Sequence, residues 1–87
     1  MQVFYSGRVQ GVGFRYTVRA TATGYEVAGT VANLADGRVQ LIVEGAPEEL
    51  ESFRQAIRDS GLAHFIEHEE VTRSDARNDF RGFEIVR

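Results

Sequence analysis

The sequence predicts an α+β fold with two helices on one face of an antiparallel sheet, and the order of its elements is the main reason. Alternating apolar and polar residues indicate strands near residues 2–9, 27–35 and 38–45. Apolar residues recur at helical spacing over residues 14–25 and again after Pro47. A last strand region, which can divide in two, completes the order βαββαβ. This order is typical of a ferredoxin-like two-layer α/β sandwich.

The first strand and the first helix flank a loop that contains two glycines. Every second residue of the strand falls on one apolar face: Val3, Tyr5, Gly7 and Val9. Phe4 interrupts the polar face. The stripe of the helix recurs every three or four residues: Phe14, Val18, Ala22 and Tyr25. Both elements therefore have one side to bury.

A hairpin joins the second and third strands. Asp36-Gly37 is the dipeptide favoured in two-residue type I′ turns, so it predicts such a turn here. In the third strand, Val39, Leu41 and Val43 face one way and the polar residues mostly face the other. This alternation predicts a sheet with one covered side.

The second helix begins at Pro47, because proline suits the first helical position and two glutamates follow it near the positive end of the helix dipole. Its buried stripe is Leu50, Phe53 and Ile57, and Gly61 is suited to the position just past its end. A strand region then covers residues 64–72. A polar turn over residues 74–79 and a closing strand with four apolar residues follow: Phe80, Phe83, Ile85 and Val86.

Length and composition predict one domain over residues 1–87. The 43% hydrophobic and 26% charged content are ordinary for a globular protein. No apolar run approaches the roughly 18 residues that a membrane span requires. The N-terminus lacks the basic and apolar regions of an export signal, so we expect a cytoplasmic protein with no membrane partner. The absence of cysteine excludes a thiolate nucleophile and a cysteine zinc site.

The charge pattern narrows the possible functions. A net charge of -3 argues against a general nucleic-acid binder, which needs a basic face. All 10 residues counted as lysine or arginine are arginines, so a Walker-type lysine and Schiff-base chemistry are excluded. Any phosphate must therefore be bound by arginine or by the backbone.

Residues 8–15, with the sequence RVQGVGFR, are the strongest candidate site. Glycines tolerate positive φ, so successive amides can turn toward one point, where a helix start adds positive charge. Arg15 could complete an anion site. The spacing is not a dinucleotide fingerprint, because Tyr16 stands where the third glycine should be. A plain strand-to-helix turn with a solvated Arg15 explains the loop equally well.

Two segments together carry a resemblance to a known family. Residues 7–15 (GRVQGVGFR) resemble the signature of the acylphosphatases (acylphosphate phosphohydrolases), small enzymes that hydrolyse carboxyl-phosphate bonds. Residues 29–33 (GTVAN), continued by Gly37, Val39 and Gly45, resemble the second signature at the spacing of the family. The closing residues 83–85 are similar too, so the resemblance spans the chain.

The resemblance implies a site and a reaction. Arg15 and Asn33 would be the catalytic residues, with Asn33 orienting the attacking water. The phosphate cradle would consist of Arg15 and the backbone amides of one loop: Gln10, Gly11, Val12, Gly13 and Phe14. A small acyl phosphate would be the substrate and inorganic phosphate the product, without a metal or cofactor, and we expect a monomer. Without the resemblance, Asn33 is read more simply as a strand-end residue of the hairpin.

The chain departs from the family pattern beside Asn33. Thr30 replaces a usual aromatic residue, and Ala32 replaces a common lysine or arginine. These changes put substrate preference and rate in question. A non-catalytic module of the same fold that binds phosphate or carbamoyl phosphate is the alternative.

Two other functions are less well supported. Residues 64–68 match the H-x-x-E-H pattern of zinc proteases, which requires a helix. We expect a strand here, in which His64 and His68 would be roughly 13 Å apart. The acidic residues of this stretch, Glu67, Glu69 and Glu70, would form a solvated face. An RNA-binding domain of this fold needs aromatic residues on its central strands, and residues 38–44 contain none.

Overall fold

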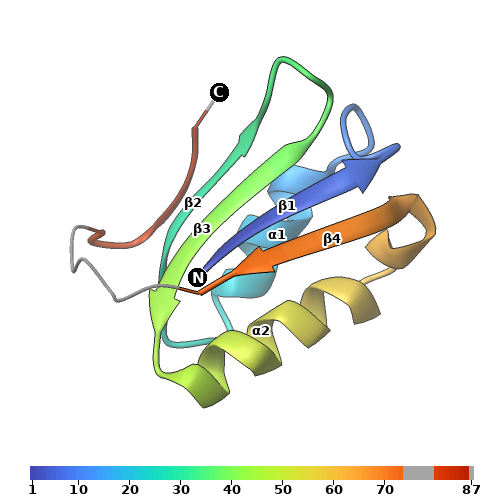
Figure 1. Cartoon of the computed structure of the whole chain (residues 1–87). Helices are drawn as coiled ribbons and strands as arrows, with labels where there is room; N and C mark the ends of the chain where they lie inside the picture. The colour runs from blue at the N-terminus through green and yellow to red at the C-terminus, as the bar shows by residue number, and fades with distance from the viewer. Residues whose placement is uncertain (74–79, 87) are drawn as a thin grey trace.

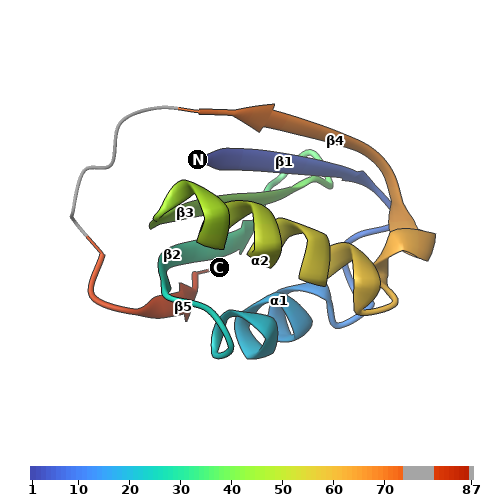
Figure 2. The same cartoon turned by 90° about the horizontal axis from the view of Figure 1, so that it is seen from below.

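The computed structural model describes residues 1–73 and 80–86, which form a sheet layer and a helix layer (Figure 1). The helices α1 (Phe14–Ala22) and α2 (Pro47–Asp59) both lie on one face of the sheet (Figure 2). A 3-10 turn, η1 (Leu62–Phe65), leads into the fourth strand. The strands are β1 (Gln2–Gly7), β2 (Val27–Asn33), β3 (Val39–Gly45), β4 (Ile66–Thr72) and β5 (Phe83–Ile85). The predicted two-layer sandwich is confirmed, and the polar turn predicted at 74–79 lies outside the described residues.

The strands follow the order β4-β1-β3-β2-β5 across the sheet. β1 pairs with β3 and β4, and β2 pairs with β3, all antiparallel. β5 pairs with β2 in parallel, so the prediction of a wholly antiparallel sheet is wrong at this edge. The chain passes from β4 at one edge of the sheet to β5 at the other edge and reverses its direction on the way. Because β2 also runs opposite to β4, β5 lies parallel to β2. The last strand region thus divides in two.

The core lies between the sheet and the helices. The predicted stripe of α2 and the predicted apolar face of β3 are buried throughout. In the other two elements the prediction is wrong at one residue each: Tyr25 is half-buried and lies past the end of α1, and Gly7 of β1 is exposed. Tyr5 and Phe14 pack with ring centroids 5.0 Å apart. Burying a side chain of this size contributes about 1.5–3 kcal/mol. The largest fully buried side chains are Tyr5, Phe14, Phe53, Leu41, Ile57, Val3, Val9, Val18, Val31, Val39 and Val43. No helix in the described part of the chain is long and apolar enough to cross a membrane.

The β2–β3 hairpin is present, but its turn differs from the prediction. The Leu34 N–H donates to the Arg38 carbonyl at 2.8 Å, and the Gly37 N–H donates to the Leu34 carbonyl at 3.1 Å. Residues 35–37 therefore span the turn, one more than in a type I′ turn. Asp36 explains the change, because its carboxylate accepts hydrogen bonds from the Arg38 N–H at 3.0 Å and from Arg38 Nε at 2.8 Å. Gly37, with φ of 94°, takes the left-handed position that such a three-residue loop requires.

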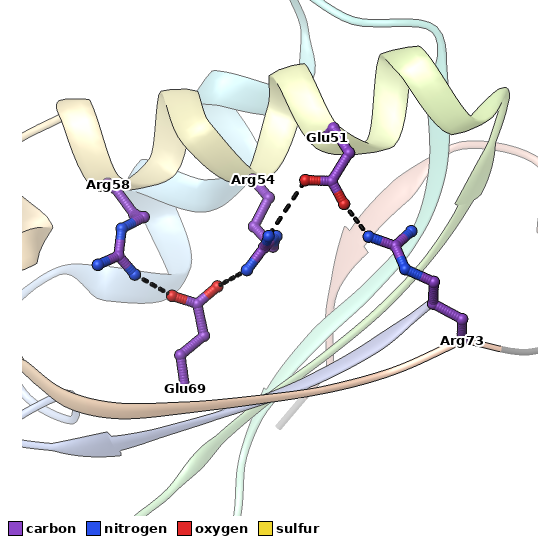
Figure 3. A network of polar contacts seen from close by, with 5 residues as sticks. All are labelled: Glu51, Arg54, Arg58, Glu69 and Arg73. Atoms are coloured by element: carbon purple, nitrogen blue, oxygen red, sulfur yellow. Dashed lines mark hydrogen bonds and ion pairs between the residues drawn. The ribbon is translucent and has the colours of Figure 1, made fainter.

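An ion-pair network joins α2 to β4 (Figure 3). The Glu69 side chain is only 7% exposed and accepts hydrogen bonds from Arg54, at 2.8 Å, and from Arg58. Arg54 also contacts Glu51 at 3.1 Å, and Glu51 binds Arg73. Glu67 and Glu70 are exposed as predicted, but the prediction of a solvated Glu69 is wrong, because α2 covers that side of the strand.

The hydroxyl of Tyr5 leads to a stability prediction. It is buried and has no hydrogen-bond partner among residues 1–73 and 80–86. Burial, with a smaller contribution from Glu69, raises the pKa of Tyr5 well above its ordinary value. In the unfolded chain a tyrosine ionises near pH 10, whereas the buried Tyr5 keeps its proton. The contribution of Tyr5 to the free energy of unfolding is therefore complete below about pH 10 and is lost as the pH rises further. Tyr5→Phe should therefore raise the free energy of unfolding by about 1 kcal/mol at neutral pH and weaken its alkaline decline.

Urea unfolding at about pH 7 and about pH 10.5, followed by circular dichroism, measures both effects. Tyr16→Phe is the matched control, because that side chain is 67% exposed and its change should leave the alkaline decline as it is. An alkaline decline in Tyr5→Phe equal to that of the unchanged protein would contradict the assignment to Tyr5.

Candidate active site

The loop between β1 and α1 is shaped by its glycines. Gly11 and Gly13 have φ of 78° and 80°, and a Cβ atom at either position would meet nothing within 4 Å. The backbone torsion, rather than lack of space, therefore favours glycine at these two positions. Gly13 is the N-cap of α1, and its carbonyl accepts the first helical hydrogen bond from the Thr17 N–H at 3.0 Å.

The N-terminus of α1 faces this loop without a side-chain cap. Gly13 has no side chain to accept hydrogen bonds from the first helical amides, and the first turn contains no acidic residue. Such amides need an acceptor, and the helix dipole favours a negative charge at this end. The local structure is therefore suited to an anion.

Asn33 reaches the same end of the molecule from β2. It is the last residue of that strand, opposite Val39, and it falls on the same face as the buried Val31, which is the helix side of the sheet. Its side-chain oxygen, Oδ1, is buried and accepts no hydrogen bond from any residue that the structure describes. A buried acceptor of this kind has an unmet need for a donor, such as a water molecule or a ligand.

A pocket of about 160 Å³ brings the predicted residues together. Arg15 and Asn33 both line it, so the structure places the two predicted catalytic side chains at one site. Its described lining includes one arginine and no carboxylate, and consists of Val9, Gly11, Gly13, Phe14, Arg15, Tyr16 and Asn33. A phosphoryl group would thus meet one cation, a helix N-terminus and a buried amide oxygen.

A larger hollow of about 510 Å³ lies at the other end of β2 and β3. Its lining includes Glu26 and Glu44, and the rest is Tyr25, Val27, Ala28, Gly45 and Phe80. Two carboxylates and no basic side chain in this lining make it unsuitable for a phosphate. The smaller pocket remains the candidate site.

Three predicted loop residues have roles that the sequence did not distinguish. Phe14 is 1% exposed, so its side chain belongs to the core. Val12 packs against the core and does not line the pocket. Gln10 does not line the pocket either, and its side-chain Nε2 donates to the carbonyls of Leu34 and Arg38 at 2.8 and 3.0 Å.

Sequence reasoning also missed Tyr16, which stands at the rim of the pocket. One signal was available, because this aromatic residue falls outside the apolar stripe of α1 formed by Phe14, Val18 and Ala22. No local signal pointed to the contact between Gln10 and the hairpin.

The two histidines of the H-x-x-E-H match lie in different elements. His64 belongs to η1 and His68 to β4, so they do not share one face of a helix. Within residues 1–73 and 80–86, no group of three or more histidine, cysteine, aspartate or glutamate side chains could hold a metal ion. The zinc-protease interpretation has no structural support in this region.

Comparisons with known proteins agree with this geometry. The family model described as Acylphosphatase matches residues 1–85. An acylphosphatase from Salinibacter ruber is 42% identical over 82 residues, which cover 94% of this chain and 86% of that protein. The crystal structure of acylphosphatase from Bacillus subtilis superimposes with a TM-score of 0.89 at 37% identity, covering 99% of this chain and 96% of that one.

A larger protein contains a similar unit. The crystal structure of T. kodakarensis HypF matches 99% of this chain with a TM-score of 0.84 and 28% identity, but the match covers only 11% of the HypF chain. The fold thus occurs by itself and within a longer polypeptide. The match over nearly the whole chain, in sequence and in structure, shows that the protein belongs to the acylphosphatase family.

Proposed function

We propose that this protein hydrolyses the carboxyl-phosphate bond of small acyl phosphates to a carboxylate and inorganic phosphate. One observation carries the proposal: Arg15, Asn33 and the two loop glycines line a single pocket at the uncapped N-terminus of α1. The acylphosphatase relatives, which are named for this reaction, support it.

Binding of the phosphoryl group would be shared between backbone and side chain. Among the predicted loop residues, Gly11, Gly13 and Phe14 line the pocket, and their amides at the start of α1 would supply donors. The Arg15 guanidinium can hold two phosphoryl oxygens at once. The described pocket lining adds no carboxylate that would repel the ligand. The amides and Arg15 together could therefore bind a dianionic phosphoryl group without a lysine.

Chemistry at such a site requires positioning more than acid-base catalysis. A water molecule attacks phosphorus, the bond from phosphorus to the acyl oxygen breaks, and the carboxylate departs as a stable anion. Charge stabilisation by Arg15 and the amides favours the loose transition state of phosphoryl transfer. Asn33 Oδ1 is buried and lacks a described donor, so it would accept a hydrogen bond from the water. This hydrogen bond would point a lone pair of the water oxygen at phosphorus.

Hydrolysis of benzoyl phosphate by the purified protein tests the proposal. We expect release of inorganic phosphate well above the rate of the uncatalysed reaction, with folding verified by circular dichroism. A folded protein with no rate above background would refute the proposal.

A binding module without hydrolysis is the second candidate, and the likeness to a small part of HypF is the observation that favours it. Its ligand would be phosphate or carbamoyl phosphate. Titration calorimetry with each ligand separates the two functions, because binding of carbamoyl phosphate without turnover would support the module and exclude the enzyme.

Tyr16 should influence which acyl groups are accepted. A pocket of about 160 Å³ has little room beyond a phosphoryl group, so the acyl group must project past the rim, where the exposed Tyr16 side chain lies. Aromatic contacts contribute about 0.5–1.5 kcal/mol. Tyr16→Ala should therefore raise KM for benzoyl phosphate roughly 2- to 10-fold and change KM for acetyl phosphate less than about 2-fold.

Steady-state kinetics with both substrates measure this split, and Tyr16→Phe is the control that keeps the ring. Equal increases in KM for the two substrates would show that Tyr16 does not contact the acyl group.

A further inference from the structure

The side chain of Gln10 connects the candidate phosphate loop to the β2–β3 hairpin. Its Nε2 atom donates to the Leu34 carbonyl at 2.8 Å and to the Arg38 carbonyl at 3.0 Å, which lie 24 and 28 positions away in the sequence. A primary amide has two N–H donors on one nitrogen, so it can serve two carbonyls at once. One side chain thus joins two elements that are distant in sequence.

The two acceptors are the residues that close the hairpin. Leu34 directly follows Asn33, and Arg38 directly precedes Val39, the strand partner of Asn33. Leu34 and Arg38 are also joined to each other by the 2.8 Å hydrogen bond that closes the turn. Gln10 therefore binds the hairpin beside the residue proposed to orient the attacking water.

The hairpin end is itself held in place. The Arg38 side chain donates to Asp36 at 2.8 Å, and its guanidinium carbon lies 4.4 Å from the centre of the Phe4 ring of β1. This cation–π contact accounts for an aromatic residue on the polar face of β1. These contacts attach the hairpin end to β1, and Gln10 attaches the loop to the same hairpin end.

Sheet topology makes this contact significant. The loop follows β1 and Asn33 ends β2, but β3 lies between these strands in the sheet. Backbone pairing therefore does not join the loop directly to the strand of Asn33. The amide of Gln10 supplies a direct link across the end of β3.

We propose that Gln10 is a positioning residue, whose side chain sets the placement of Asn33 relative to the phosphate cradle. This inference rests on the proposed function, in which water held by Asn33 attacks a phosphoryl group held by the loop. Misplacement of reacting groups by about 1 Å can lower a rate on the order of 100-fold. Gln10 would therefore affect turnover without touching the substrate through its side chain.

The variant Gln10→Met tests this, because methionine has similar length and no N–H donor. We expect kcat for benzoyl phosphate to fall roughly 10- to 50-fold, while the inhibition constant of inorganic phosphate changes less than about 3-fold. Gln55→Met is the matched control. It removes a glutamine amide that donates to Asp59 on α2, away from the pocket lining, and it should leave both constants unchanged.

A double-mutant cycle separates positioning from a general loss of stability. If Gln10 acts through Asn33, Gln10→Met should lower kcat less than about 2-fold in a protein that already carries Asn33→Ala. A full, additive loss in that background would overturn the proposal. Unchanged kcat for Gln10→Met in an active protein would overturn it as well.

A measurement without turnover distinguishes failure of this inference from failure of the proposed function. Absence of hydrolysis in the unchanged protein would refute the proposed function alone. In either case, the NMR resonances of the Asn33 side-chain amide should shift or broaden in Gln10→Met and not in Gln55→Met. Resonances unaffected by Gln10→Met would overturn the positioning role.

Discussion

Replacing Arg15 with alanine is expected to lower kcat/KM for benzoyl phosphate by roughly 1,000-fold. Arg15 is the cation among the described residues that line the pocket, and the lining contains no other basic side chain. An arginine that stabilises the charge of a phosphoryl-transfer transition state contributes on the order of 10³–10⁵ in rate. Because Arg15 would also hold the phosphoryl group in the ground state, KM should rise and kcat should fall.

Two further variants complete the test: Arg15→Lys separates charge from geometry, and Arg19→Ala is the control. Lysine keeps the charge but not the two-pronged geometry, so it should recover only part of the activity. Arg19 lies in the last turn of α1 and is exposed, and its loss should leave the kinetics unchanged. An inhibition constant of inorganic phosphate that stays the same in Arg15→Ala would contradict a binding role.

Asn33→Ala should lower kcat roughly 100- to 1,000-fold while the inhibition constant of inorganic phosphate changes less than about 3-fold. Loss of one well-placed polar group in a preorganised site has an effect of this order. Binding is spared because the cradle and Arg15 remain. Stability should not suffer, since the Oδ1 atom that alanine removes is buried without a described hydrogen-bond donor.

Kinetics and urea unfolding of the same preparation test this pair of expectations. Thr72→Ala is the control and should leave kcat unchanged, because this exposed residue of β4 lies opposite Gln2, at the end of β1 away from the loop. Equal losses of kcat and of phosphate affinity in Asn33→Ala would place Asn33 in the cradle and not beside the water.

The sequence predicted those parts of the fold that depend on local patterns. The buried residues of α1 and α2 could be predicted because apolar side chains recur in the sequence with the helical period. The start of α2 could be predicted because proline has no N–H and a fixed φ, which suit the first helical position. The parallel β5 was not predictable in this way, because its direction relative to β2 depends on a connection between opposite edges of the sheet. Glu69 was misjudged for a related reason: alternation along β4 carries no information about Arg54 and Arg58 above it.

In the candidate site, too, features with a local sequence signal were predicted and contacts between distant residues were not. The glycine loop pointed to Arg15, whereas only the resemblance to the acylphosphatases pointed to Asn33, and the structure places both at one pocket. The turn beside Asn33 was predicted one residue too short, because the dipeptide rule does not include the hydrogen bonds from Arg38 to Asp36. The bridging side chain of Gln10 could not be seen from its neighbours, since its acceptors are 24 and 28 positions away.

The inner position of β1 has a consequence for how the chain folds. Gln2 stands opposite both Ile42 of β3 and Thr72 of β4, so the earliest strand finds its two partners far along the chain. High contact order of this kind slows folding, because long loops must close before their pairings are formed. The loop after β1 likewise depends on a partner far along the chain, since the Arg8 N–H donates to the Phe65 carbonyl at 2.9 Å. The loop proposed to bind phosphate should therefore reach its final conformation only after η1 has packed against it, and a chain cut before Leu62 should have little affinity for phosphate.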